Sequence, residues 1–327
     1  MKKRRAVALI IAIVLIISSL ALKFTTSIAS GVFDELFKMD SIYVEEKILR
    51  EGSLTEKIVV INLEGIIMGG KNNLINDGYN HEVLLDQLRE AFTNDTVDAI
   101  ILHIDSPGGS VYETAQIHRL IVEHKEKYGK PFYVSMGSMA TSGGYYVAAP
   151  ADKIYADNST LTGSIGVILE NINYAEFAEK HGVKWNTITS GKHKDIMSPS
   201  REMTKEERDI LQSMIDEMYD EFVQVIVDGR GLDEATVRKV GDGRIYTGKQ
   251  AKKIDLVDEV GSLEDAIDGL IADHALDNPM VVEYTQELGF FDLLAPGFQS
   301  LFAKNEEISW LRSLLLESDQ PRALYMY

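Results

Sequence analysis

Two kinds of segment alternate along residues 57–275. Continuous apolar runs such as KIVVINL and AIILHI are typical of strands that are buried on both faces of a parallel sheet. Between them, segments such as VYETAQIHRLIVEHKEKY repeat their apolar positions at helical spacing. Buried strands that alternate with amphipathic helices predict an α/β domain. We expect its main strands at KIVVINLEGIIMGG, VDAIILHIDSPGG and PFYVSMGSMA, with shorter ones in residues 153–169 and 184–191 and a last one from residue 279.

A long helix is predicted to begin after Thr204. Glu207, three positions later, completes a capping box, in which each side chain bonds the backbone amide of the other residue. Apolar residues then recur every four positions, which indicates a stripe that faces the core or another subunit. The stripe consists of Ile210, Met214, Met218, Phe222 and Ile226.

The N-terminus predicts a membrane anchor. The basic residues 1–5, MKKRR, precede residues 6–22, which carry no charge and match the lower end of the ~17–25 residues of a membrane helix. A cleavable signal peptide is the alternative, but residues 27–29, Ser-Ile-Ala, offer a poor cleavage site. Basic residues keep their end in the cytoplasm, so the body is expected outside the cell membrane. A linker over 23–56, a folded domain over 57–275 and a C-terminal extension over 276–327 would follow.

Composition excludes several classes of function. The formal net charge is −18 although four basic residues stand in the first five positions, so a nucleic-acid partner is not expected. The chain has no cysteine, which excludes thiol nucleophiles, disulfides and thiolate metal sites. The segment GRIYTGKQ, residues 243–250, approaches a phosphate-binding loop, but Gln250 replaces the hydroxyl that would hold magnesium. No metal and no cofactor are expected.

Two glycine-rich turns stand where predicted strands end and helices begin, at DSPGGS (105–110) and TSGG (141–144). Amides at such positions lack helical partners and can bind a developing negative charge. Each turn alone is also compatible with an ordinary serine-capped connection. Ser142, beside such amides, has the position of a nucleophile in acyl-transfer enzymes, and it would need a base.

The base is not evident among the histidines. His103 stands in a buried strand pattern, His81 and His274 are predicted at the surface, and residues 143–180 contain no histidine. The polar turn GKHKD, residues 191–195, offers another solution, because a lysine whose pKa is lowered toward ~7–8 can accept the serine proton. From this motif alone, an exposed basic loop is the favoured interpretation.

Five motifs in order resemble the signal peptide peptidase A family, also called protease IV, in its short single-module form: DSPGGSV, GSMATSGGYY, LTGSIGV, SGKHKD and GDGRIYTGKQAKKIDLVDEVG. The resemblance spans residues 57–275 and implies a ClpP/crotonase-like fold of repeated ββα units with a serine–lysine dyad. It implies Ser142 as the nucleophile and Lys194 as the base, with Lys192 a weaker candidate. It further implies Gly109 and Gly143 as oxyanion-hole donors and Ser164 as the residue that orients the lysine.

The function that this resemblance implies is membrane-anchored serine endopeptidase activity on signal peptides left in the membrane after preprotein processing. By analogy with double-length relatives, we expect a homo-oligomeric ring in which Ser142 of one subunit meets Lys194 of its neighbour. A crotonase-like acyl-CoA enzyme and an inactive membrane scaffold are the alternatives. The terminal residues ALYMY, small and apolar, are a further candidate as a self-ligand of the substrate groove.

Overall fold

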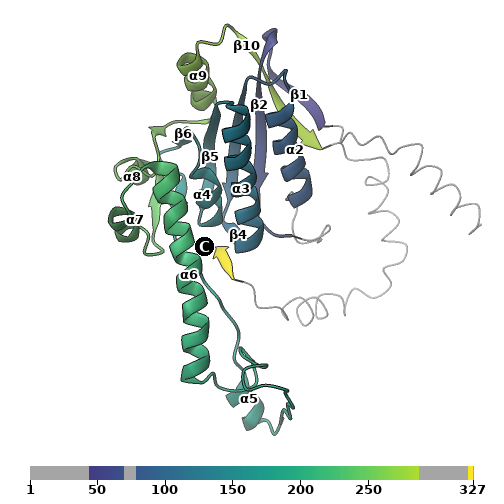
Figure 1. Ribbon diagram of the computed structural model, residues 1–327, viewed down its shortest axis with the longest axis vertical. Coiled ribbons are helices and arrows are strands. Elements are labelled where there is room, and N and C mark those ends of the chain that lie inside the picture. Colours follow the sequence, from purple (N-terminus) through teal and green to yellow (C-terminus); the bar gives the residue numbers. More distant parts are fainter. Residues whose placement is uncertain (1–43, 70–78, 287–322, 327) are drawn as a thin grey trace, which may run out of the picture. The chain divides into compact units, whose positions relative to one another are not determined.

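The computed structural model describes residues 44–69, 79–286 and 323–326. A mixed β-sheet with helices on both faces forms an α/β fold (Figure 1), as predicted. The predicted anchor at residues 6–22 lies outside the described residues, and none of the helices within them is long and apolar enough to cross a membrane. The strands are β1 (Val44–Arg50), β2 (Ser53–Glu64), β3 (Ala99–Ser106), β4 (Gly108–Ser110), β5 (Phe132–Thr141), β6 (Lys153–Ala156), β7 (Leu161–Gly163), β8 (Ile245–Thr247), β9 (Glu259–Val260), β10 (Pro279–Gln286) and β11 (Leu324–Met326). The helices are α2 (His81–Thr93), α3 (Val111–Tyr128), α4 (Gly143–Ala148), α5 (Ala175–Lys180), α6 (Lys205–Arg230), α7 (Glu234–Val240), α8 (Gly248–Lys252) and α9 (Leu263–His274).

The main sheet runs in the order β1-β10-β2-β3-β5-β6-β9, and β7 joins β5 to β8. The strands from β10 to β9 are parallel to their neighbours, whereas β1 and β8 pair antiparallel. Two of the predicted boundaries need correction. Residues 44–56, predicted as linker, form β1 and the start of β2, and residues 279–286 lie inside the sheet instead of in an extension. The sequence of β1 or β10 alone does not predict that the two strands pair, because each partner lies more than 200 residues away in the chain.

Apolar side chains fill both faces of the sheet. The larger cluster joins the strands to α2, α3, α4 and the C-terminal half of α6. A smaller cluster on the opposite face is covered by α9. Because the central strands are buried on both sides, their side chains are continuously apolar, which explains the runs in the sequence.

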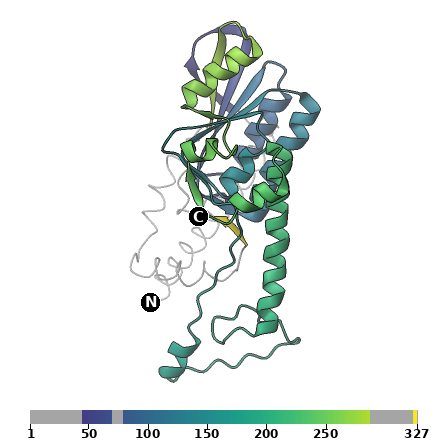
Figure 2. The same ribbon diagram turned by 90° about the vertical axis from the view of Figure 1, so that its left-hand side faces the viewer.

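Helix α6 is only partly a core helix. Its capping box is confirmed, with Thr204 Oγ1 accepting from Glu207 N at 3.2 Å and Glu207 accepting from Thr204 N at 3.0 Å. Phe222 and Ile226 are buried, but Ile210 and Met214 in its N-terminal half are exposed. Figure 1 and Figure 2 show that this half runs away from the sheet toward α5.

Residues 170–204, which we call the arm, lie at that far end of α6. The predicted strand at residues 184–191 is wrong, because the structure has no strand there and its residues are exposed. An apolar and β-branched run such as WNTIT forms a strand only where another strand edge offers hydrogen bonds. The arm has no such edge in the described part of the chain.

Candidate active site

Ser142 joins the end of β5 to the start of α4. Its backbone has φ 52° and ψ −114°, a region that side-chain-bearing residues rarely adopt and that costs of the order of 1–3 kcal/mol. The side chain is buried, and within the described residues Oγ has no hydrogen-bond partner. A buried hydroxyl without a partner is unfavourable for stability. The fold therefore holds Ser142 in a strained conformation with its oxygen free to react.

The Gly109 amide points toward the same place. On one edge of β4, Ile67 N donates to Gly108 O at 2.9 Å and Ser110 N donates to Ile67 O at 2.7 Å. Successive residues of a strand direct their amides to opposite edges. The amide of Gly109 therefore faces away from Ile67, toward the edge that β11 occupies.

Gly143 supplies a second amide. It is the first residue of α4, where an N–H group has no acceptor within the helix. Gly108, with φ 97°, has room for no side chain, because a Cβ there would lie 2.6 Å from Gly143 N and even closer to Tyr325 O. Gly143 N and the Tyr325 carbonyl oxygen therefore both lie close to Gly108, which is compatible with the predicted oxyanion hole of Gly109 and Gly143.

The C-terminal strand β11 lies extended beside these groups. It pairs antiparallel with β4, Tyr325 opposite Gly109, and Val111 N donates to Ala323 O at 3.3 Å. Hydrogen-bonded pairs recur every second residue in an antiparallel ladder, so the Tyr325 carbonyl is directed to Gly109 N–H. On its other edge, Leu324 exchanges two hydrogen bonds of 3.0 Å with Ile168.

The side chain of Tyr325 fills an apolar pocket and is fully buried. Its ring centroid lies 5.1 Å from that of Tyr146 and 4.8 Å from that of Phe222, and its hydroxyl donates to Met218 O at 3.0 Å. Sequence reasoning did not identify this pocket. The available signals were the tyrosines of GGYY, directly after Ser142, and the apolar stripe of α6.

Ser164 also lies at this site. Thr141 pairs with Gly163 across β5 and β7, and Ser142 N donates to Gly163 O at 2.7 Å. Ser164, the next residue, is buried and has φ 51°. Ser142, Gly143, Gly109 and Ser164, which stand in three separate motifs of the sequence, are therefore brought together.

Lys194 is not brought to Ser142 within one chain. The turn that carries it contacts the start of α6, where Lys192 pairs with Glu206 and His193 Nε2 lies 3.2 Å from the same carboxylate. Phe222, near the Ser142 end, follows Glu206 by four and a half helical turns, or about 24 Å along the axis. That separation is far beyond the reach of a lysine side chain.

None of the seven histidines, all of which lie within the described residues, hydrogen-bonds Ser142 Oγ. His81, predicted at the surface, is instead buried and hydrogen-bonds Tyr79 at 2.7 Å and Gln116 at 2.9 Å. This correction reflects the start of α2 packing against α3, which no local pattern reveals. His103 lies 3.3 Å from Ser135, and burial lowers the pKa of His103.

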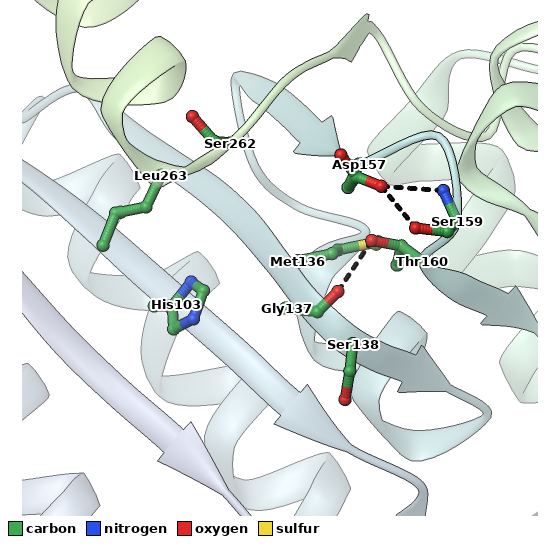
Figure 3. A pocket seen from close by; sticks show the side chains of 9 residues that line it. All are labelled: His103, Met136, Gly137, Ser138, Asp157, Ser159, Thr160, Ser262 and Leu263. Carbon is green, nitrogen blue, oxygen red and sulfur yellow. Dashed lines mark hydrogen bonds between the residues drawn. The ribbon is translucent and has the colours of Figure 1, made fainter.

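A separate pocket of about 350 Å³ contains His103 and several hydroxyl groups (Figure 3). Each of those hydroxyls already donates a hydrogen bond: Ser138 to Asp105, Ser159 to Asp157, Thr160 to Gly137 O and Ser262 to Asp265. None is therefore placed as a free nucleophile, in contrast to Ser142. Ser142 does not line this pocket.

Comparison with known proteins identifies the family of this chain. Residues 124–277 match the profile described as peptidase family S49. A protein of Enterococcus faecium named signal peptide peptidase SppA is 36% identical over 299 residues, which cover 87% of this chain and 85% of the relative. Protease 4 of Haemophilus influenzae is 36% identical over 67% of this chain, which spans only 35% of that relative. A solved mutant of ClpP1 from Listeria monocytogenes has a TM-score of 0.41 at 17% identity and covers 64% of this chain and 94% of its own. This chain belongs to peptidase family S49 and is a serine peptidase.

Proposed function

We propose that the chain is a membrane-anchored endopeptidase that degrades signal peptides left in the membrane after preprotein processing. The observation that carries the proposal is Ser142, which is buried, strained and unpartnered beside the amides of Gly109 and Gly143. A crotonase-like acyl-CoA enzyme would need the amides but not the serine. An inactive scaffold would need neither.

In the proposed reaction, the neutral amine of Lys194 accepts the proton of Ser142 while Oγ attacks the peptide carbonyl. The oxygen of the tetrahedral intermediate accepts hydrogen bonds from Gly109 and Gly143. The protonated lysine then gives its proton to the leaving amine, and water hydrolyses the acyl-enzyme by the reverse sequence. Ser164 orients the lysine amine. Since only the neutral amine works as a base, activity is expected to rise toward alkaline pH.

The dyad is proposed to form between two subunits of a ring. Its support is the distance of about 24 Å along α6, which leaves Lys194 outside its own active site. The arm also exposes large apolar side chains, such as Phe177, Trp185 and fully exposed Ile188. Surfaces of this kind mark contacts with other molecules. A second copy of the chain would cover the arm and supply the missing base.

The substrate is proposed to be an unfolded, apolar peptide bound as a strand. The path of β11 between Gly109 and Ile168 indicates how such a peptide would pair. The resemblance to the family implies small or aliphatic residues near the cut, and the pocket that holds Tyr325 extends this preference to aromatic residues. The proposed anchor at residues 6–22 would place the site outside the cell membrane, beside these peptides. We also propose that the α/β fold is of the ClpP/crotonase type.

Hydrolysis of a fluorogenic apolar peptide by the whole protein in detergent tests the proposal. Ser142→Ala and Lys194→Ala are each expected to lose nearly all activity. Mixing the two variants under conditions that allow subunit exchange is expected to restore activity, since some sites then receive Ser142 from one chain and Lys194 from the other. Full activity in either single variant contradicts the dyad, and exchange without recovery contradicts its sharing between subunits.

A further inference from the structure

An ion-pair network closes the base of the arm. The Arg201 guanidinium binds Asp195 through two bonds of 2.8 and 2.9 Å and Glu207 through two bonds of 2.8 and 2.5 Å. The Glu207 side chain is only 2% exposed and also accepts from the amide and hydroxyl of Thr204, each at 3.0 Å. One arginine thus joins the arm to the capping box of α6.

Asp195, which Arg201 binds, directly follows Lys194 in the sequence. Arg201 Nη2 additionally donates to the Asp195 carbonyl at 3.2 Å, so both the side chain and the backbone of Asp195 are held. The surrounding turn is closed by Lys194 N to Gly191 O at 3.2 Å and Ser198 N to Asp195 O at 2.9 Å. The backbone of Lys194 is therefore tied to the first turn of α6.

We infer that Arg201 is a positioning residue that fixes the turn carrying Lys194 so that the lysine can meet Ser142 of the neighbouring subunit. This inference rests on the proposed shared dyad. A general base has to stand about 2.6–3.2 Å from the proton that it accepts, and a displacement of 1 Å can lower the rate about a hundredfold. At the end of a helix that projects from the sheet, a small tilt moves the lysine by more than that. A bidentate arginine clamp on each side removes this freedom, which a lysine with its single point charge cannot do.

The nearby pair of Lys192 with Glu206 has no comparable role. Both side chains are largely exposed, and exposed pairs contribute little to structure. Lys192→Gln therefore serves as the matched control, since it removes a cation from the same turn without touching the clamp. It is expected to keep near-wild-type activity.

The test is to mix Arg201→Gln with each of two other variants, Ser142→Ala and Lys194→Ala, and to measure which mixture regains peptidase activity. Arg201→Gln alone is expected to lose about a hundredfold in kcat. Its Ser142 remains competent, so mixing with Ser142→Ala, which supplies a well-placed Lys194, should restore activity. Mixing with Lys194→Ala should not, because every lysine in that mixture is absent or misplaced. If Arg201→Gln simply lost its structure, its activity would be the same in both mixtures.

The mixture of Ser142→Ala with Lys194→Ala separates the inference from its premise. If that mixture stays inactive although subunits exchange, the shared dyad is wrong. If that mixture recovers activity, the shared dyad stands and the Arg201→Gln mixtures test the positioning role. The positioning role is wrong if Lys194→Ala restores the activity of Arg201→Gln, or if neither partner does. It is also wrong if Arg201→Gln keeps full activity alone. Should Arg201→Gln fail to assemble, Asp195→Ala decides by the same two mixtures, because it removes both side-chain bonds between Asp195 and Arg201 but leaves Arg201 paired with Glu207.

Discussion

Tyr325, close to the C-terminus, pairs with Gly109 in an antiparallel ladder beside Ser142. The pairing directs its carbonyl to the amides that we assign to the oxyanion hole, and its ring fills the adjoining pocket. The chain's own end therefore lies where a substrate strand would bind. This geometry supports the interpretation of ALYMY as a self-ligand.

Deletion of residues 316–327 should raise turnover of a short peptide at low substrate concentration. A tethered strand competes at a high effective concentration, so its removal is expected to lower KM. Adding the free peptide ALYMY to the truncated protein should inhibit it competitively. Removal of Tyr327 alone is the control and should change KM little. Unchanged kcat and KM after the full deletion would dispose of the self-ligand.

Phe222→Leu should shift specificity. Loss of part of the aromatic wall is expected to lower kcat/KM for peptides with Tyr or Phe before the cut by about tenfold relative to peptides with Leu. Both kcat/KM values are measured on the same variant. A general loss of stability therefore lowers both equally and leaves their ratio unchanged. Phe92→Leu, which changes a buried phenylalanine of α2 packed on Phe132, should leave the ratio as in wild type. An unchanged ratio in Phe222→Leu would remove this residue from the substrate pocket.

Lys194→Ala and Lys192→Ala should differ sharply. General base catalysis contributes about 10²–10⁴-fold, so Lys194→Ala is expected to lower kcat by at least that much. Lys192, engaged with Glu206 at the surface, should tolerate the change. Both rates are measured on one peptide under the same conditions. Equal losses in the two variants would indicate that the turn acts as a structural unit and would contradict Lys194 as the base.

Phe177→Asp should weaken assembly. Phe177 on α5 is 66% exposed, and a charge there would be costly in an apolar interface between copies. Light scattering is expected to show smaller particles, with a parallel loss of peptidase activity. Leu54→Asp is the control, because Leu54 is 83% exposed at the start of β2, outside the arm. Assembly that is equally sensitive to both changes would argue against the arm as the interface.

The clamp should also appear in the pH dependence of stability. The Arg201 guanidinium, and hydrogen bonds from Thr204, lower the pKa of Glu207 to about 2. In the unfolded chain this carboxyl titrates at about 4.3, so its stabilisation is fully present above that pH and is lost as pH falls toward 2. The difference in unfolding free energy between wild type and Arg201→Gln is therefore expected to be constant above pH 5 and to shrink below pH 4. His193, whose Nδ1 lies 3.9 Å from Glu207, is present in both proteins.

Chemical denaturation at a series of pH values measures this difference. Arg89→Gln, which removes an exposed pair with Asp86, is the control and should show only a small change in stability at any pH. A difference for Arg201→Gln that does not change between pH 6 and pH 3 would show that Glu207 does not depend on Arg201 for its charge.

Much of the fold was determined locally in the sequence. Continuous apolar runs produce strands such as β3 because both faces of that strand are buried, and the Thr204–Glu207 capping box starts α6 because its bonds involve only neighbouring residues. The glycines of the turns at residues 105–110 and 141–144 likewise predicted which backbone amides lie beside Ser142. For Gly108, the positive φ and the contact with Gly143 N explain why only glycine fits.

Other features were decided only by tertiary structure, because they join residues distant in sequence. Strand β1 exists through pairing with β10, and His81 is buried by α3. Residues 184–191 are irregular, and among the residues that the structure describes no strand edge lies beside them. The sequence by itself placed a serine and a lysine in motifs of one peptidase family. The fold decided that the two lie at opposite ends of α6, since a rigid helix cannot bend to join them.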